Sequence, residues 1–303
     1  MRVLVAGAAG FLGLAAVAAL SRGGHEVVGL VRSPAKAAHV EAAGGTPAVG
    51  DVLNASALAQ AAAGCDALIH LAHTRDAGSP ALGQSMAAKV RVDGAYNLVA
   101  AARAVKARRL VIGSGYWEFG HHEGTITEET PLNPIGTSVF NYQAERAGLE
   151  ANRPGDLEVV VARPGMVYGD GGWFKEMVGA IRGGTYRVPG DGANHWSPVH
   201  VDDVGEGFRL LLEEGGAGQA YLIVDDEPLP LKEFAGLIAE TLGVDPPVHE
   251  SMEDTKARIG ETRAKMLTAN QRASNAKLRG VGWAPRWRSS REGVPAVVRA
   301  MGP

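Results

Sequence analysis

The chain has 303 residues, of which 46% are hydrophobic and 21% are charged, and its formal net charge is −3. This composition is that of a globular protein with a sizeable core. The near balance of charge gives no electrostatic support for a nucleic-acid partner. Cys65 is the only cysteine, which excludes an intramolecular disulfide and a cysteine-based metal site and fits a reducing, cytoplasmic environment. Apolar runs are broken well before about 18 residues, so no membrane span is expected.

Strand and helix patterns alternate in the first half of the chain. Strands are expected at 2–6, 25–31, 46–49, 67–72, 109–112 and 158–162. Helices are expected at 11–22, 34–43, 55–62, 84–105 and 141–152. The run 67–72 is continuously hydrophobic, as in a strand that is buried on both faces. The alternation predicts an α/β fold with a doubly wound parallel sheet of the Rossmann type.

The regular alternation fades after Pro164. Later elements are a helix at 204–214, a strand at 220–224 and a helix at 231–242, while the mixed charges of 256–277 predict a solvated helix face. We therefore expect residues 1–165 to form the Rossmann domain, which the glycine-rich turn described below predicts to bind a dinucleotide. Residues 166–303 form mainly a smaller C-terminal substrate-binding lobe, with segments around 199–225 returning to the sheet.

A glycine-rich turn joins the first strand to the first helix, in the sequence Gly7-Ala-Ala-Gly10-Phe11-Leu12-Gly13. Gly7 permits a sharp turn, Gly10 lets the backbone approach a pyrophosphate, and Gly13 lets the helix pack close to the sheet. The helix N-terminus offers free N–H groups and a positive dipole end to phosphates. The turn predicts a nicotinamide dinucleotide as cofactor.

The end of the second strand bears on which dinucleotide is bound. An NAD site usually has an acidic residue there to hold the ribose 2′-hydroxyl, but this chain has Val31 followed by Arg32. A guanidinium can pair with a 2′-phosphate through two hydrogen bonds. Arg32 therefore favours NADP. NAD stays an alternative, because Arg32 can also be a solvated charge at a strand end.

Six motifs in this order resemble the extended short-chain dehydrogenase/reductase family, of the NAD(P)-dependent epimerase/dehydratase type. They are the glycine-rich turn, Gly50-Asp51-Val52, Ile69-His70-Leu71-Ala72-His73, Tyr142-x-x-x-Arg146, the run Arg163-Pro164-Gly165-Met166-Val167-Tyr168-Gly169, and Val199-His200-Val201-Asp202-Asp203. The ending Gly280-Val-Gly-Trp283-Ala-Pro285 is also similar. The resemblance implies that Asp51 and Val52 lie at the adenine, Leu71, Ala72 and His73 near the ribose, and Pro164 and Val167 beside the nicotinamide.

Tyr142 and Arg146 are four residues apart on an expected helix, so they share one face. The resemblance implies that Tyr142 exchanges a proton with the substrate oxygen and that Arg146, which stands where the family has Lys, is its catalytic partner. It also implies that both residues contact the cofactor. A nearby cation favours the phenolate form of a tyrosine. Arg keeps that charge, but its fork is larger than an ammonium group. Tyr142 as a packed aromatic residue is the alternative.

The family's Ser or Thr after the fifth strand has no counterpart at the same place. That place falls on Gly115, between Ser114 and Tyr116. Ser114 is a candidate catalytic residue, although strand alternation can point it away. Tyr116 is the other available hydroxyl. Without either hydroxyl, one hydrogen bond to the reacting oxygen is missing. By analogy with an oxyanion hole, this raises the activation barrier by about 3–4 kcal/mol.

Residues near the expected substrate site are apolar. Met166 and Trp196 stand where sugar-nucleotide enzymes of the family carry Asn and Arg, so they provide an apolar wall instead of pyrophosphate donors. Three more aromatic residues, Trp117, Trp173 and Phe174, are candidates for lining this pocket. The sequence His121-His122-Glu123 lacks a third spaced ligand, and no metal is expected. Asp202 or Asp203 is expected to cap a helix that begins at Val204.

The leading hypothesis is an NADP-dependent oxidoreductase that transfers hydride between the nicotinamide and a small, partly apolar carbonyl or alcohol. One alternative is a sugar-nucleotide epimerase or dehydratase that uses the cofactor transiently. Another is a non-catalytic NAD(P)-binding sensor, which Gly115 and Arg146 keep open. The expected partner is a small-molecule substrate. The resemblance also implies a homodimer through the helices at 84–105 and 141–152.

Overall fold

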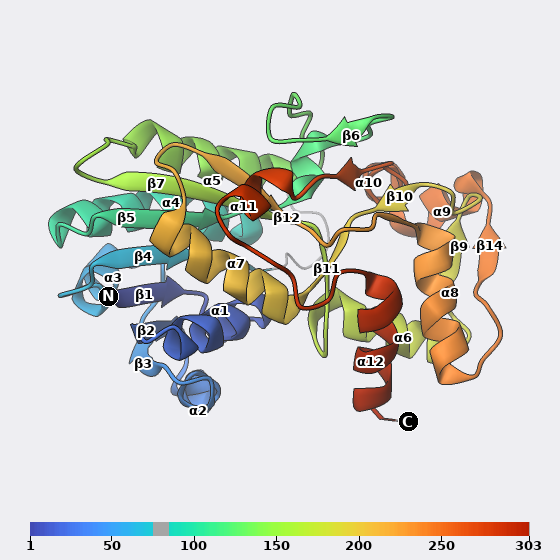
Figure 1. Ribbon diagram of the computed structural model, residues 1–303, viewed down its shortest axis with the longest axis horizontal. Coiled ribbons are helices and arrows are strands. Elements are labelled where there is room, and N and C mark those ends of the chain that lie inside the picture. Colours follow the sequence, from blue (N-terminus) through green and yellow to red (C-terminus); the bar gives the residue numbers. More distant parts are fainter. Residues whose placement is uncertain (75–84, 303) are drawn as a thin grey trace.

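Parallel strands form a central seven-stranded sheet in the computed structural model, which describes residues 1–74 and 85–302 (Figure 1). The strands are β1 (Arg2–Ala6), β2 (Glu26–Val31), β3 (Thr46–Val49), β4 (Ala67–His70), β5 (Arg109–Gly113), β7 (Glu158–Pro164) and β12 (Ala220–Ile223). Their order is β12-β7-β5-β4-β1-β2-β3. The chain leaves β1 in one direction to reach β2 and β3, and in the other to reach β4 and β5. The predicted Rossmann-type α/β fold is confirmed, with its switch point between β1 and β4.

Helices cover both faces of this sheet. One face carries α3 (Ala55–Ala61), α4 (Met86–Ala104) and α5 (Ser138–Ala151), and the other carries α1 (Phe11–Arg22), α2 (Ala37–Ala42) and α7 (Val201–Glu214). Alternate strand residues serve the two cores, because side chains alternate across a strand. Leu4 belongs to the core under α4, while Val3 and Val5 belong to the core under α1. The predicted helix at 84–105 begins at Met86, and Gln84 lies outside the described residues.

Three further helix starts differ from the prediction. Helix α5 begins at Ser138, three residues before the expected start at 141. The expected helix at 34–43 is a 3-10 turn, η1 (Pro34–Lys36), followed by the short α2. Helix α7 begins at Val201, since the His200 side chain caps it by accepting a hydrogen bond from the Asp202 N–H at 3.2 Å. Asp202 and Asp203 therefore lie inside the first turn, and the expectation that one of them caps the helix is wrong.

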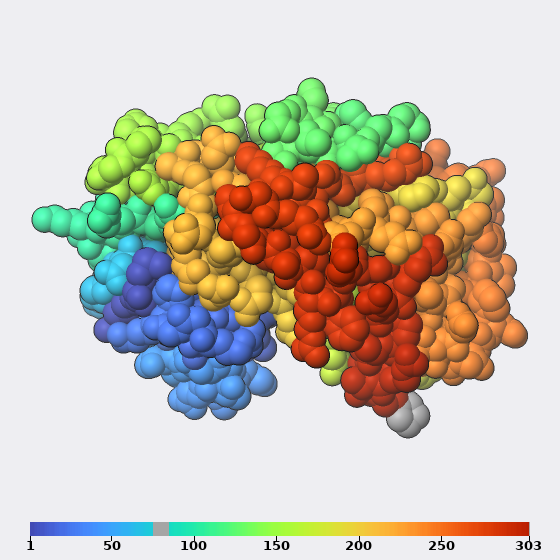
Figure 2. Space-filling view, viewed as in Figure 1, coloured from blue at the N-terminus to red at the C-terminus, as the bar shows by residue number. Residues whose placement is uncertain are grey.

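A second lobe stands beside the sheet and has its own core. It contains β8 (Met166–Tyr168), α6 (Gly172–Arg182), β9 (Arg187–Pro189), β10 (His195–Trp196), β11 (Pro198–His200), β13 (Leu229–Pro230), α8 (Leu231–Leu242), β14 (Val248–Glu250) and α12 (Ser290–Ala300). Buried aromatic residues fill it, among them Phe174, Trp196 and Phe234. Figure 2 shows the two ends of the molecule, with the surface indented between the blue N-terminal segments and the red α12.

The stretch 256–277 is not the single solvated helix face that its charges predict. It takes in the last part of α9 (Met252–Ile259), then α10 (Glu261–Leu267) and a buried segment. It continues into β15 (Arg272–Ala273), which pairs with β6 (Thr125–Ile126). Gln271 is fully buried. Its Nε2 donates to the Tyr116 carbonyl at 3.1 Å, and its own carbonyl accepts from Ser197 Oγ at 2.9 Å. The carbonyl that accepts from Ser197 is the Gln271 backbone carbonyl, and the side-chain Oε1 has no partner in the described part of the chain. The one side-chain bond is made to a distant backbone group, so the charge pattern alone could not place this residue.

No helix in the described part of the chain is both long and apolar enough to cross a membrane.

Asp225 follows β12 at the junction of the two lobes and is buried. Its Oδ1 accepts the Glu227 N–H at 3.1 Å, while Oδ2 has no partner among the described residues. Burial raises the pKa of this carboxyl from 3.8 to about 8. Between these two values the folded protein holds a proton that the unfolded chain has released. Stability therefore falls as pH rises across this window.

We expect Asp225→Asn to remove this loss, because the amide stays neutral and keeps an acceptor for Glu227. One pKa unit corresponds to about 1.4 kcal/mol, so the variant should gain a few kcal/mol of unfolding free energy, relative to the unmodified chain, from about pH 5 to about pH 8. Urea unfolding at several pH values measures this. The exposed Asp245→Asn is the control, and an unchanged pH slope in Asp225→Asn contradicts the assignment.

Candidate active site

The turn before α1 is tightly packed against β4. Gly7 has φ +87, and a Cβ on it would lie 2.6 Å from Ala72 N. A Cβ on Gly13 would lie 2.1 Å from the Gly7 carbonyl oxygen. At Gly10, the N-cap of α1, a Cβ would meet only that same oxygen at 3.2 Å, and no side chain caps the helix. The first-turn N–H groups are thus available to an anion, and the cradle fits the diphosphate of a dinucleotide.

Phe11 and Leu12 contribute to this cradle through their backbone. The Phe11 ring contacts the loop after β8, since a Cβ on Gly171 would lie 2.7 Å from Phe11 Cδ2. Leu12 is partly buried against the core beneath α1. The Phe11 side chain therefore holds the turn against the second lobe, and no side chain caps the amides at the helix start.

Other predicted cofactor residues lie at the carboxyl ends of β2, β3 and β4. Arg32 is exposed directly after β2, and its guanidinium has no hydrogen bond or ion pair with any other described residue. Asp51 Oδ1 accepts the Leu53 N–H at 2.9 Å, which shapes the turn after β3, and Val52 is buried beside it. Three further predicted residues, Leu71, Ala72 and His73, follow β4, with Ala72 buried and His73 exposed.

Two predicted residues beside the nicotinamide come from β7 and β8. Pro164 ends β7, and its carbonyl oxygen lies 4.0 Å from the position that a Cβ on Gly115 would take. Val167 lies in β8 and is 7% exposed. The strand ends thus bring all of these positions to one edge of the sheet, where ligands of open α/β folds bind.

Tyr142 and Arg146 lie side by side on α5, as their spacing predicts. Tyr142 is half-buried, whereas the Arg146 side chain is 57% exposed and donates to Glu150 Oε1 at 2.8 Å. Glu150 first, and Tyr142 after it, raise the pKa of Arg146 above its ordinary value. The cation next to the phenol is therefore shared with a surface carboxylate.

Neither hydroxyl that flanks Gly115 is directed at the space beside it. Ser114 Oγ donates to the Glu118 carboxyl group. Tyr116 is fully buried, and burial raises the pKa of its phenol well above the usual range. Tyr116 belongs to the 3-10 helix η3 (Tyr116–Phe119), which turns its ring into the core of the second lobe. Ser114 as a substrate contact stays a prediction, with its hydroxyl engaged elsewhere.

A buried charged network lies beneath this edge, and the sequence did not reveal it. Arg163 Nε and Nη2 donate to the two oxygens of Glu145 at 2.8 and 2.6 Å. Arg91 Nε donates to Asn141 Oδ1 at 2.8 Å, and its Nη2 donates to the Gly113 carbonyl at 2.5 Å. Asn141 and Glu145 are four residues apart, so one face of α5 carries both. In the sequence, the available signal for this network was the four-residue spacing of the polar Asn141 and Glu145 among small buried residues of the same helix.

Burial sets the protonation of this network. Burial lowers the pKa of Arg91 to about 10, which leaves it a cation at neutral pH. Burial first, and then the neighbouring Glu145, raise the pKa of Glu118 well above its usual range. Burial also lowers the pKa of His70 to about 3. The neutral His70 lies 2.9 Å from the Arg91 carbonyl through Nε2, which must carry the proton because a carbonyl only accepts.

The aromatic residues expected in a substrate pocket are divided between the core and its border. Phe174 and Trp196 are 0% and 1% exposed, so they pack in the core and do not face a pocket. Trp117 and Trp173 are half-buried, and their rings lie 6.5 and 5.8 Å from that of Trp196. Trp117 Cδ1 would lie 3.8 Å from a Cβ on Gly115. Trp117 is therefore the aromatic side chain that borders the candidate site.

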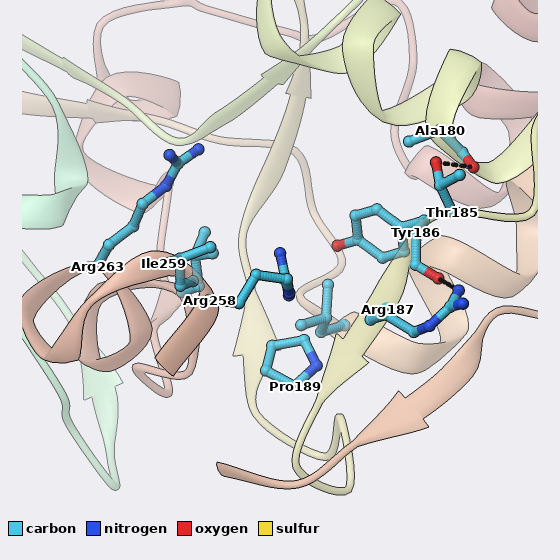
Figure 3. A pocket seen from close by; sticks show the side chains of 10 residues that line it. Ala180, Thr185, Tyr186, Arg187, Pro189, Arg258, Ile259 and Arg263 are labelled. Carbon is cyan, nitrogen blue, oxygen red and sulfur yellow. Dashed lines mark hydrogen bonds between the residues drawn. The ribbon is translucent and has the colours of Figure 1, made fainter. Parts of the chain in front are cut away.

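A separate hollow of about 190 Å³ lies in the second lobe, between β9 and the helices α9 and α10 (Figure 3). Three arginines line it, namely Arg187, Arg258 and Arg263. Arg187 donates to two backbone carbonyls, and Arg258 pairs with Glu250 at 2.7 Å. Two of these charges are thus already engaged within the protein. Within the described ranges no three His, Cys, Asp or Glu side chains gather as a metal site.

Comparison with known proteins agrees with this geometry. The model of the NAD dependent epimerase/dehydratase family matches residues 3–223. A 3-diazoavenalumate denitrifying reductase of Streptomyces sp is 33% identical over 97% of this chain and 99% of its own length. A 4-hydroxy-2-methyl-3-oxo-4-farnesyl-3,4-dihydroquinoline-1-oxide ketoreductase of Stigmatella aurantiaca is 32% identical over 92% and 85%. The crystal structure of DesIV, a dTDP-glucose 4,6-dehydratase from Streptomyces venezuelae with NAD bound, matches with TM-score 0.83 and 27% identity over 99% and 96%.

The contact between Gly13 and Gly7 makes the turn testable. We expect Gly13→Ala to weaken dinucleotide binding, because its Cβ forces the Gly7 carbonyl and the start of α1 apart. Overpacking of this kind costs about 1–3 kcal/mol, which corresponds to roughly 10- to 100-fold in affinity. Titration of NADPH and NADH fluorescence measures the change. The control is Gly236→Ala on α8, where a Cβ meets nothing within 4 Å. Wild-type affinity in Gly13→Ala would refute the placement of the diphosphate.

Proposed function

We propose that this chain, which belongs to the NAD dependent epimerase/dehydratase family, is an NADP-dependent oxidoreductase acting on a small, partly apolar carbonyl or alcohol. The observation that carries the proposal is the shared sheet edge. The backbone cradle at α1 opens there, and the helix that carries the half-buried Tyr142 borders the same edge through Asn141 and Gly115. A reduced cofactor bound in that cradle supplies a hydride, and Tyr142 supplies the proton for the substrate oxygen.

The chemistry around Gly115 supports an apolar substrate over a sugar nucleotide. The Trp117 ring borders the space, and Met166 packs in the apolar core of the second lobe to which Trp117 is joined. The nearest guanidinium groups of the network are engaged: Arg163 by Glu145, and Arg91 by Asn141 and backbone carbonyls. A pyrophosphate requires free donors and positive charge. The relative named as a ketoreductase supports a carbonyl substrate.

The exposed Arg32 supports NADP as the cofactor. We expect Arg32→Ala to weaken NADPH binding by about 10- to 100-fold, since a charge-assisted hydrogen bond contributes about 1.5–3 kcal/mol, and to leave NADH binding little changed. Fluorescence titration of both dinucleotides measures the ratio. Arg22→Ala, at the far end of α1, is the control. Equal losses for NADPH and NADH would count against the assignment.

The oxidoreductase itself is tested by NADPH consumption with a panel of apolar aldehydes and ketones. We expect turnover by the unmodified chain and a loss of about 10²- to 10⁴-fold in Tyr142→Phe, the usual contribution of a positioned proton donor. NADPH affinity should stay unchanged. Tyr96→Phe, an exposed tyrosine on α4, serves as the control.

Two other outcomes identify the alternatives. Deuterium uptake from solvent without net cofactor change indicates an epimerase or dehydratase. Tight NADPH binding with no turnover across the panel indicates a sensor, the function that the surface pairing of Arg146 with Glu150 would favour.

A further inference from the structure

The space beside Gly115 lacks a hydroxyl group but is not without a hydrogen-bond donor. A Cβ on Gly115 would lie 3.6 Å from Asn141 Nδ2, the closest atom to it, and farther from Trp117 and Pro164. The φ of Gly115 is −169, which is extended backbone open to any residue. A side-chain oxygen at this position would therefore be within about one hydrogen bond of the Asn141 amide. The amide therefore lies next to the place from which such an oxygen would act.

The orientation of the Asn141 amide follows from Arg91. A guanidinium only donates, so the atom that Arg91 Nε contacts at 2.8 Å must be the amide oxygen. The two N–H bonds of Nδ2 then point away from Arg91. Nδ2 makes no hydrogen bond to any group in the described part of the chain. The amide thus presents unused donors toward Gly115.

Arg91 also strengthens this donor. The guanidinium is 7% exposed and is held at three carbonyl-type oxygens: Asn141 Oδ1, the Gly113 carbonyl at 2.5 Å and the Ala72 carbonyl at 3.4 Å. A cation bonded to the amide oxygen withdraws electron density and makes the N–H groups better donors. Ala72 follows β4 and Gly113 ends β5, so the Arg91 guanidinium also fixes the Asn141 amide relative to this edge of the sheet.

We propose that Asn141 Nδ2 donates a hydrogen bond to the reacting carbonyl oxygen and takes the role for which Gly115 leaves no hydroxyl. This inference rests on the proposed reductase function. In the reduction a C–H bond forms from the hydride, the π electron pair of the carbonyl moves to oxygen, and Tyr142 protonates that oxygen while the cofactor is oxidised. Asn141 gains and loses no proton. It stabilises the negative charge that develops on oxygen, as a neutral oxyanion-hole donor does.

Three variants separate a donor from a merely structural amide. Asn141→Ala removes the donor and the Arg91 acceptor, whereas Asn141→Asp keeps an acceptor for Arg91 and replaces the N–H groups by a carboxylate oxygen, which only accepts when ionised. We expect both to lower kcat for ketone reduction by roughly 10²-fold, with NADPH affinity unchanged. Adding Gly115→Ser to Asn141→Ala should restore at least tenfold of the loss, since a serine hydroxyl fits the open space. Wild-type kcat in Asn141→Asp, or no rescue by Gly115→Ser, overturns the proposal.

A measurement without turnover keeps this test independent of the reductase function. The probe is ¹³C-carbonyl-labelled acetophenone, bound together with NADP⁺, which cannot reduce it. Infrared difference spectra should show a carbonyl stretch shifted to lower frequency in the unmodified chain and shifted back in Asn141→Ala and Asn141→Asp. Loss of the shift in both variants supports the donor even if NADPH consumption is absent. Equal carbonyl frequencies in the unmodified chain and the variants overturn it, whether or not acetophenone is reduced.

Discussion

One buried guanidinium, that of Arg91, joins the parts from which the site is built. It extends from α4 to the ends of β4 and β5 and to Asn141 on α5. A buried charge is tolerated only when its donors are satisfied, because desolvation otherwise costs several kcal/mol. These contacts meet that requirement, and the neutral His70 donates a hydrogen bond from Nε2 to the Arg91 backbone carbonyl. The strand ends that approach the cofactor cradle are therefore fixed by one cation.

A second layer of charge explains which face of α5 is turned inward. Glu145 forms a two-point ion pair with the buried Arg163, and Glu118 lies beside it with its pKa raised by burial. Neighbouring residues on a helix point about 100° apart. Turning Asn141 and Glu145 toward the sheet thus places Arg146 toward the surface, where it pairs with Glu150. The buried partners of Asn141 and Glu145 thus decide how α5 is rotated, and with it the position of Tyr142 on that helix.

The second lobe reaches the site through polar contacts as well as packing. Gln271 Nε2 donates to the Tyr116 carbonyl, the Gln271 backbone carbonyl accepts from Ser197 Oγ, and Asn270 Oδ1 accepts the His195 N–H at 2.8 Å. Asp203 accepts the N–H groups of Arg286 and Trp287 at 2.7 and 3.1 Å. These contacts connect segments about 75 to 155 residues apart in the chain, in the range over which no local pattern operates. The Gln271 contact with Tyr116 ties η3, which also carries Trp117, to the segment before β15.

The sequence by itself determined what depends on local backbone chemistry. The glycine turn, the strands and the helices of the first half were predictable because each requires particular residues within a few positions of one another. The spacing of Tyr142 and Arg146 likewise predicted that they would be neighbours. The tertiary structure alone decided which face of α5 is buried, that Ser114 bonds to Glu118, and that Gln271 lies in the core. In each case a polar group is satisfied by a partner on another element, and the energy of such a bond depends on where the chain brings the partner rather than on its position in the sequence.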